Sequence, residues 1–130
     1  SRGLGDVYKR QIPYRGEKDG VRFVFEDGSR RWETVCRYAP QTVMIYGVYP
    51  FPVADKGRAL HQANQVNATL TRGGLFLSGE RIVLRVSADL FDAYSAQESI
   101  TRALEYSAGV MKHFWTQMEA CAKQSGVFQH

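Results

Sequence analysis

The first half of the chain alternates between apolar and polar positions, which is the pattern of strands with one buried face. Apolar side chains occupy every second position of residues 21–25, and residues 30–38 alternate in the same way. Residues 42–48 are rich in β-branched and aromatic side chains, which favour strands. The Asp27-Gly28 pair marks a hairpin turn. These patterns predict three consecutive antiparallel strands.

The second half predicts a helix, a second hairpin and a longer helix. Residues 56–70 place apolar side chains at helical spacing, and residues 75–77 and 81–87 read as two short strands. Residues 95–123 again follow helical spacing. The order is therefore β-β-β-α-β-β-α, which favours an α+β fold with an antiparallel five-stranded sheet and helices packed on it. Two helices cover one face of a sheet, so we expect the other face to be exposed or covered by a partner.

The long predicted helix begins with a capping box, Ser95 with Glu98 three positions later. It carries two neighbouring apolar stripes, whereas a surface helix normally needs one. One interpretation is a broad contact with the core and with a missing upstream segment. The other is that the second stripe meets a protein partner or a second copy of the chain, since Trp and Met are enriched at interfaces. The predicted partner or dimer surface consists of Leu104, Met111, Trp115 and Met118.

Residues 1–11 differ in origin from the rest of the chain. They read SRGLGDVYKRQ, which is the in-frame translation of a transposon-based sequencing adaptor. We therefore exclude them from the fold, assign residues 12–124 to a single domain and residues 125–130 to a tail, and expect the natural protein to begin upstream of Ile12. The segment contributes three basic residues and one acidic residue, so the net charge falls from +4 to +2 without it. Such a charge is weak support for nucleic-acid or membrane binding.

Residues that could carry chemistry are scattered along the chain. His61, His113 and His130 have no metal-ligand spacing, and no nucleophile or phosphate-loop motif occurs. Cys36 and Cys121 read as two buried free thiols, and without an export signal this favours the cytoplasm. We therefore predict a protein that is not an enzyme, that has no catalytic residues, metal or cofactor, and that does not enter a membrane.

Two other function classes remain open. A small-ligand-binding protein or an accessory enzyme subunit would use the exposed sheet face, and a pocket lined by Trp32, Cys36 and Tyr38 would favour it. Nucleic-acid binding is the third hypothesis. It is less favoured because the arginines of residues 30–38 share their face with Glu33, while the aromatic side chains point the other way.

The second half also carries a family resemblance. It contains YPFPV at residues 49–53, then a helix with Asn64-x-x-Asn67, then the hairpin GGLFLSGERIVLRVSADL and a capped long helix. In these features the chain resembles the YbjN family, which shares the fold of type III secretion chaperones. The residues that match the family's hairpin pattern are Phe76, Leu77, Val83 and Arg85.

The resemblance implies a compact, often dimeric bacterial protein that binds other proteins or acts in regulation. No catalytic residue is known for the family, so none is assigned here. The IPYR segment, residues 12–15, resembles the end of a first helix that this chain lacks.

Overall fold

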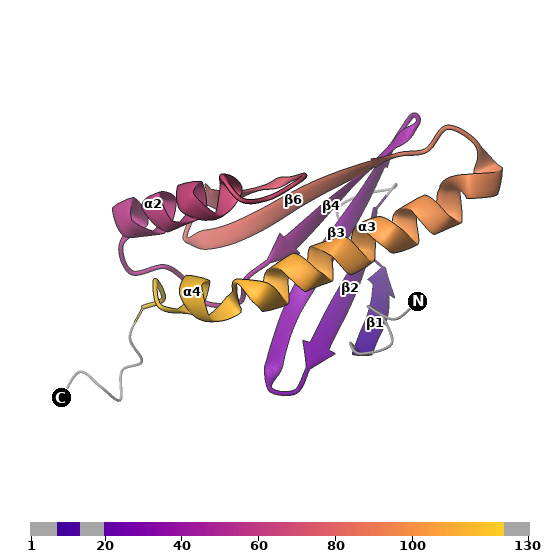
Figure 1. Ribbon diagram of the computed structural model, residues 1–130. Coiled ribbons are helices and arrows are strands. Elements are labelled where there is room, and N and C mark those ends of the chain that lie inside the picture. Colours follow the sequence, from indigo (N-terminus) through magenta and orange to yellow (C-terminus); the bar gives the residue numbers. More distant parts are fainter. Residues whose placement is uncertain (1–7, 14–19, 124–130) are drawn as a thin grey trace.

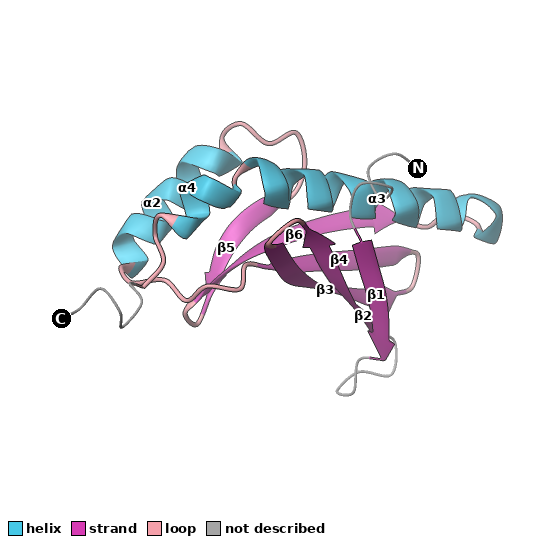
Figure 2. Cartoon of the chain, turned by 90° about the horizontal axis from the view of Figure 1, so that it is seen from below, coloured by secondary structure: helices cyan, strands magenta, loops and turns pink. Residues whose placement is uncertain are grey.

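The computed structural model describes residues 8–13 and 20–123. Six antiparallel strands form one sheet in the order β1-β2-β3-β4-β6-β5 (Figure 1). The helices of the described part lie together on one side of this sheet (Figure 2). The strands are β1 (Tyr8–Pro13), β2 (Gly20–Asp27), β3 (Arg30–Ala39), β4 (Thr42–Val48), β5 (Gly74–Ser78) and β6 (Arg81–Asp89), and the helices are α2 (Lys56–Asn67), α3 (Ala93–His113) and α4 (Trp115–Glu119).

All five predicted strands are present in the predicted order, so the α+β class with an antiparallel sheet is confirmed. β4 begins and ends at the predicted residues. The turns of the two predicted hairpins contain Gly28 at φ 65° and Gly79 at φ 62°. Glycine adopts this left-handed backbone without steric cost, which is why these two positions reverse the chain.

The sheet also contains a strand that the sequence analysis did not expect. β1 pairs with β2 from Tyr8↔Glu26 to Pro13↔Val21, although residues 8–11 belong to the segment assigned to a sequencing adaptor. Strand pairing is made by backbone groups, so it does not depend on native side chains. The structure thus differs from the expectation that residues 1–11 stand outside the fold, while their adaptor origin stays a prediction. Ile12 and Pro13 belong to the extended strand β1, whereas the sequence analysis compared this segment with the end of a helix. The predicted tail, residues 125–130, lies outside the described residues.

The final helix starts earlier than predicted and is interrupted. Asp92, not Ser95, is the N-cap of α3, and its carboxylate accepts a hydrogen bond from the Ser95 backbone N–H at 2.9 Å. The negative charge of Asp92 at the helix N-terminus favours this start over Ser95. Phe114 leaves the helical conformation (φ −100°, ψ 11°), so the predicted single helix is divided into α3 and the short α4. This break allows α4 to pack against α2, where Gln117 donates a hydrogen bond to Gln62 at 2.6 Å.

The hydrophobic core lies between the helices and the sheet face beneath them, which we call the inner face. α3 runs across this face (Figure 1) and packs tightly against Gly47 of β4, where an added Cβ would lie 3.1 Å from Met111 Sδ. Beside this contact the Tyr49 hydroxyl donates a hydrogen bond to the Met111 carbonyl at 2.9 Å. The buried inner-face side chains include Phe25, Trp32, Thr34, Cys36, Val43, Ile45, Ile82, Leu84, Val86 and Ala88.

The exposed edge of β5 is closed by a side chain from α2. Asn67 accepts a hydrogen bond from the Leu75 backbone N–H at 2.7 Å, and it donates one to the Leu75 carbonyl at 3.0 Å. One amide side chain thus satisfies both outward-facing backbone groups of Leu75, as a neighbouring strand would. Asn64, the other asparagine of the family-like motif, is exposed.

Candidate functional site

The predicted partner surface on the last helix is not a surface. Leu104, Met111, Trp115 and Met118 are each at most 5% exposed within the chain itself. Both apolar stripes pack inside the hydrophobic core. α3 lies over the middle of the sheet and contacts β4 and β6, and α4 packs against α2. The assignment of these four residues to a partner or dimer contact was therefore wrong. The broad core contact of the first interpretation is present, whereas its missing upstream segment stays a prediction.

The predicted ligand pocket is also not formed. Trp32 and Cys36 are buried on the inner face beneath the helices, and only Tyr38, at the end of β3, is partly exposed. The sequence analysis assigned these three residues to the exposed face of the sheet, whereas the alternate residues of β3 occupy it. The pattern defined two faces but did not reveal which one the helices cover.

The sheet face opposite the helices, which we call the outer face, is covered by no element of the described part of the chain (Figure 2). Half-exposed apolar side chains lie in its centre, from Val35 on β3 to Tyr46 and Val48 on β4. On β2 to β6, five arginines and three acidic residues surround them. The strand register places the following residues on this face: Arg22, Val24, Glu26, Arg31, Glu33, Val35, Arg37, Thr42, Met44, Tyr46, Val48, Phe76, Arg81, Val83, Arg85, Ser87 and Asp89.

Ion pairs on the outer face are partly exposed to solvent. Arg31 lies 3.1 Å from Glu26 across the β2–β3 ladder, and Arg22 lies 3.5 Å from Glu33. Pairs of this kind contribute little stability, because water screens them. Their side chains can therefore exchange partners at low cost, which suits a surface that meets another molecule.

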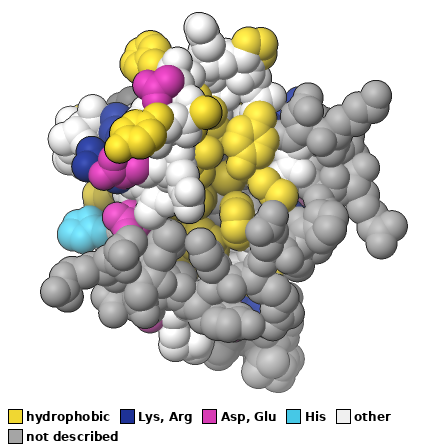
Figure 3. Space-filling model, turned by 90° about the vertical axis from the view of Figure 1, so that its right-hand side faces the viewer, with side chains coloured by type: hydrophobic (Ala, Val, Ile, Leu, Met, Phe, Trp, Pro, Cys, Tyr) yellow, Lys and Arg dark blue, Asp and Glu magenta, His cyan; other side chains and the backbone are white. Residues whose placement is uncertain are grey.

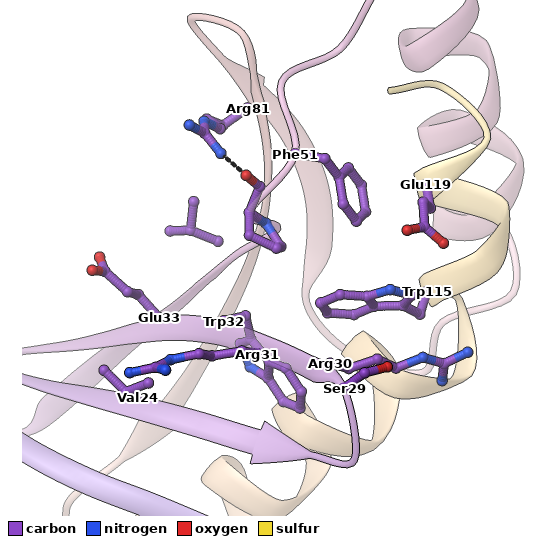
Figure 4. A pocket seen from close by; sticks show the side chains of 12 residues that line it. Val24, Ser29, Arg30, Arg31, Trp32, Glu33, Phe51, Arg81, Trp115 and Glu119 are labelled. Atoms are coloured by element: carbon purple, nitrogen blue, oxygen red, sulfur yellow. Dashed lines mark hydrogen bonds between the residues drawn. The ribbon is translucent and has the colours of Figure 1, made fainter. Parts of the chain in front are cut away.

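At one end of the outer face the surface is hollowed, and we call this hollow the end groove (Figure 4). Its volume is about 970 Å³, at the upper end of the range of ligand pockets. The β2–β3 hairpin, the segment after β4 and α4 form its walls. The residues that line it are Val24, Ser29, Arg30, Arg31, Trp32, Glu33, Val48, Pro50, Phe51, Arg81, Trp115 and Glu119.

An aromatic cluster supports the wall of the end groove. The Trp115 ring centroid lies 5.6 Å from that of Trp32, 5.4 Å from Tyr49 and 5.5 Å from Phe51, in tilted or edge-to-face arrangements. Such contacts add to the stability gained from burial alone. The rings support the wall, because each is packed against at least one other ring.

Arginines form the rim of the end groove. Arg30 reaches α3 and α4, where it donates hydrogen bonds to the Lys112 carbonyl at 3.4 Å and to Thr116 Oγ1 at 3.3 Å. Arg81 donates a hydrogen bond to the Pro50 carbonyl (dashed line in Figure 4). A guanidinium carries five N–H donors, so each arginine keeps donors beyond those used here.

Buried ionisable groups elsewhere are held in their neutral form. Burial raises the pKa of the Tyr49 hydroxyl, and burial also raises the pKa of the Cys121 thiol. A thiol with a raised pKa is a poor nucleophile, because the thiolate is the reactive form. Within residues 20–123, no three His, Cys, Asp or Glu side chains are grouped closely enough to hold a metal ion.

No protein-family model matches the chain, and no curated protein matches it. None of the helices in the described ranges is both long enough and apolar enough to cross a bilayer.

A second exposed apolar region lies at the end where α3 begins (Figure 3). Phe91 is 78% exposed and Tyr94 is 98% exposed in the connection from β6 to α3 and in the first turn of α3. The Leu90 backbone N–H donates to the Gln41 carbonyl at 2.8 Å, which brings the β3–β4 turn to the same end, beside the partly exposed Tyr38 near the end of β3.

Sequence reasoning missed the end groove because its residues are distant in the chain. Trp115 and Phe51 are more than sixty positions apart and meet only through the fold. The outer face, by contrast, left a signal, since the alternation of β3 already separated Arg31, Glu33 and Arg37 from the aromatic residues.

Proposed function

We propose that this chain is a non-enzymatic protein-binding module whose docking surface is the outer face of its sheet. The observation that carries the proposal is the composition of that face. It combines half-exposed apolar side chains in the centre with charged side chains around them, which is the anatomy of a protein interface. The resemblance to the YbjN family supports the same class of function, including its regulatory form.

The charge of the outer face indicates the kind of partner. On β2 to β6, five arginines against three acidic residues give it a net positive charge. A homodimer through this face would bring two positive surfaces together, which is unfavourable. A different protein with an acidic surface fits better. A continuous basic face, as nucleic acids require, is interrupted by Glu26 and Glu33 and by their pairs with arginines.

Ligand binding is the second candidate function, and one observation favours it. The end groove has a suitable volume, and both apolar and charged residues line it. A small ligand there would leave the rest of the outer face unused, and this distinguishes the two functions experimentally.

The proposal can be tested by selecting peptides that bind the full chain from a phage-displayed library of random peptides. The first variant, Arg37→Glu with Arg85→Glu, reverses two charges on the outer face. The matched control, Arg58→Glu with Arg102→Glu, makes the same change in net charge on the helix side, where both residues are exposed. Circular dichroism establishes that each variant remains folded.

We expect the selected peptides to lose about tenfold or more in affinity for the outer-face variant and to bind the control as they bind the unmodified chain. Equal losses with both variants would indicate non-specific electrostatic attraction. Either that result or a selection without enriched sequences would overturn the proposal.

A further inference from the structure

The end groove is built as an anchoring site within the outer face. Val24, Arg31, Glu33, Val48 and Arg81 belong to both the groove and the outer face, so the two surfaces are continuous. Figure 4 shows Phe51 and Trp115 standing on the side of α4, opposite Glu33 and Arg31 on the sheet. A chain segment that crosses the outer face can therefore enter the groove without a turn.

We propose that the end groove anchors an acidic peptide segment of the partner, with one apolar side chain inserted between Phe51 and Val48 and carboxylates paired with the arginines of the rim. This inference rests on the proposed protein-binding function. It identifies the partner by chemistry, as a segment that combines Asp or Glu with a large apolar residue.

The apolar part of the groove fits a side chain rather than water. Val48 and Phe51 are half-buried, and Pro50 offers no N–H to a solvent molecule. Covering such a surface with one large apolar side chain gains the free energy of removing both from water. Anchors of this type dominate the binding energy of protein interfaces when charged groups surround them.

Charge complementarity favours an acidic segment. Arg30, Arg31 and Arg81 line the groove, against Glu33 and Glu119. Glu33 is already 3.5 Å from Arg22, which reduces its repulsion toward an incoming carboxylate, whereas Arg31 is 3.1 Å from Glu26 and has to share or exchange that pair. Arginine binds carboxylates through two parallel hydrogen bonds, so the rim offers both charge and orientation.

A nucleotide base fits this groove less well than a peptide. Binding of bases depends on aromatic faces that are open to stacking. Trp32 is 1% exposed and Trp115 is 5% exposed, because their rings pack against each other and against neighbouring rings. The tryptophans therefore support the wall and present little ring surface for stacking.

The test uses fluorescence anisotropy with three labelled synthetic peptides and one labelled single-stranded oligonucleotide. The first peptide alternates Glu and Asp around a central Leu-Trp pair. The second replaces Leu-Trp with Ser-Ser, and the third replaces the acidic residues with Lys. We expect the first peptide to bind about tenfold or more tightly than the other two and than the oligonucleotide.

Two variants locate the binding site, and each has a matched control on α2, outside both the groove and the outer face. Arg31→Glu reverses a charge on the rim, and Arg58→Glu makes the same change at an exposed position of α2. Val48→Lys removes apolar surface but adds positive charge, and Leu60→Lys makes the corresponding change at an exposed apolar side chain of α2. We expect about tenfold weaker binding from Arg31→Glu and Val48→Lys, and less than about twofold change from the controls.

Each other outcome overturns the inference in a recognisable way. Failure of the acidic apolar peptide to bind, or equal losses with Arg31→Glu and Arg58→Glu, would show that the groove is not the anchor. If the affinity of the library-selected peptides still depended on Arg37 and Arg85 in that case, the proposed protein-binding function would stand. Only the assignment of the end groove as the anchoring site would be wrong. Tighter binding of the oligonucleotide would replace the peptide with a nucleic acid.

Discussion

The Asn67 amide offers a sharp test of how the edge of the sheet is closed. Its side chain is bound to both backbone groups of Leu75, at 2.7 Å and 3.0 Å. The substitution Asn67→Ala removes both hydrogen bonds. Leu75 itself is only 4% exposed, so water reaches its backbone groups poorly once the amide is gone.

The size of the effect follows from these two bonds. Each hydrogen bond contributes about 0.5–1.5 kcal/mol, so their loss costs about 1–3 kcal/mol of unfolding free energy. Alanine forms helices better than asparagine, which raises the unfolding free energy by about a few tenths of a kcal/mol. Asn64→Ala carries the same helical gain in the same helix and removes an exposed side chain. The difference between the two variants therefore isolates the hydrogen bonds to Leu75.

Urea unfolding followed by tryptophan fluorescence measures this difference. We expect Asn67→Ala to be about 1–3 kcal/mol less stable than Asn64→Ala, with unchanged slope in urea. Asn67→Asp keeps the acceptor but places a carboxylate against the Leu75 carbonyl, so it should be destabilised as well. If Asn67→Ala and Asn64→Ala unfold within about 0.5 kcal/mol of each other, the amide does not close the edge.

Three further predictions follow from the core and its turns. Trp115→Ala should lower the unfolding free energy by about 3–5 kcal/mol without changing the sedimentation coefficient of the folded chain, and a changed oligomeric state with unchanged stability would contradict its buried position. Burial raises the pKa of Tyr49 above its ordinary value of 10.0, so the folded chain keeps this proton where the unfolded chain loses it. Stability should therefore fall as pH rises above 10, by up to about 1.4 kcal/mol per pH unit, and urea titrations of Tyr49→Phe should show a shallower decline. Gly73→Ala puts a Cβ 2.6 Å from the Arg85 carbonyl oxygen at φ 74° and should cost at least about 1–2 kcal/mol in the same assay, whereas a neutral result would refute the close approach.

The strands were predictable because alternation is a local property. Residues 42–48 carry enough β-branched side chains to set both ends of β4, and the glycines at 28 and 79 set two of the turns. The same alternation could not say which face the helices would cover. The covered face is the one against which α3 packs. α3 packs on the face that contains Gly47, because the absence of a side chain there leaves room for Met111.

The long helix shows why the partner surface was misplaced. Two apolar stripes are ambiguous in sequence, because a wide core contact and a narrow contact plus an interface look alike. The break at Phe114 resolves the ambiguity in three dimensions. It redirects Trp115 into the rings of Trp32, Tyr49 and Phe51, three residues that are distant from it in the chain.

The strict alternation of β3 has a consequence for how this chain can change over generations. Trp32 and Thr34 lie in the core, whereas Arg31 and Glu33 lie on the outer face. Inserting or deleting one residue in β3 would exchange the two sets and place charged side chains under the helices. Insertions and deletions in natural variants should therefore be confined to the turns that contain Gly28, Gln41 and Gly79. Within the strands only substitutions remain available, and on the outer face those can alter recognition while the interior stays intact.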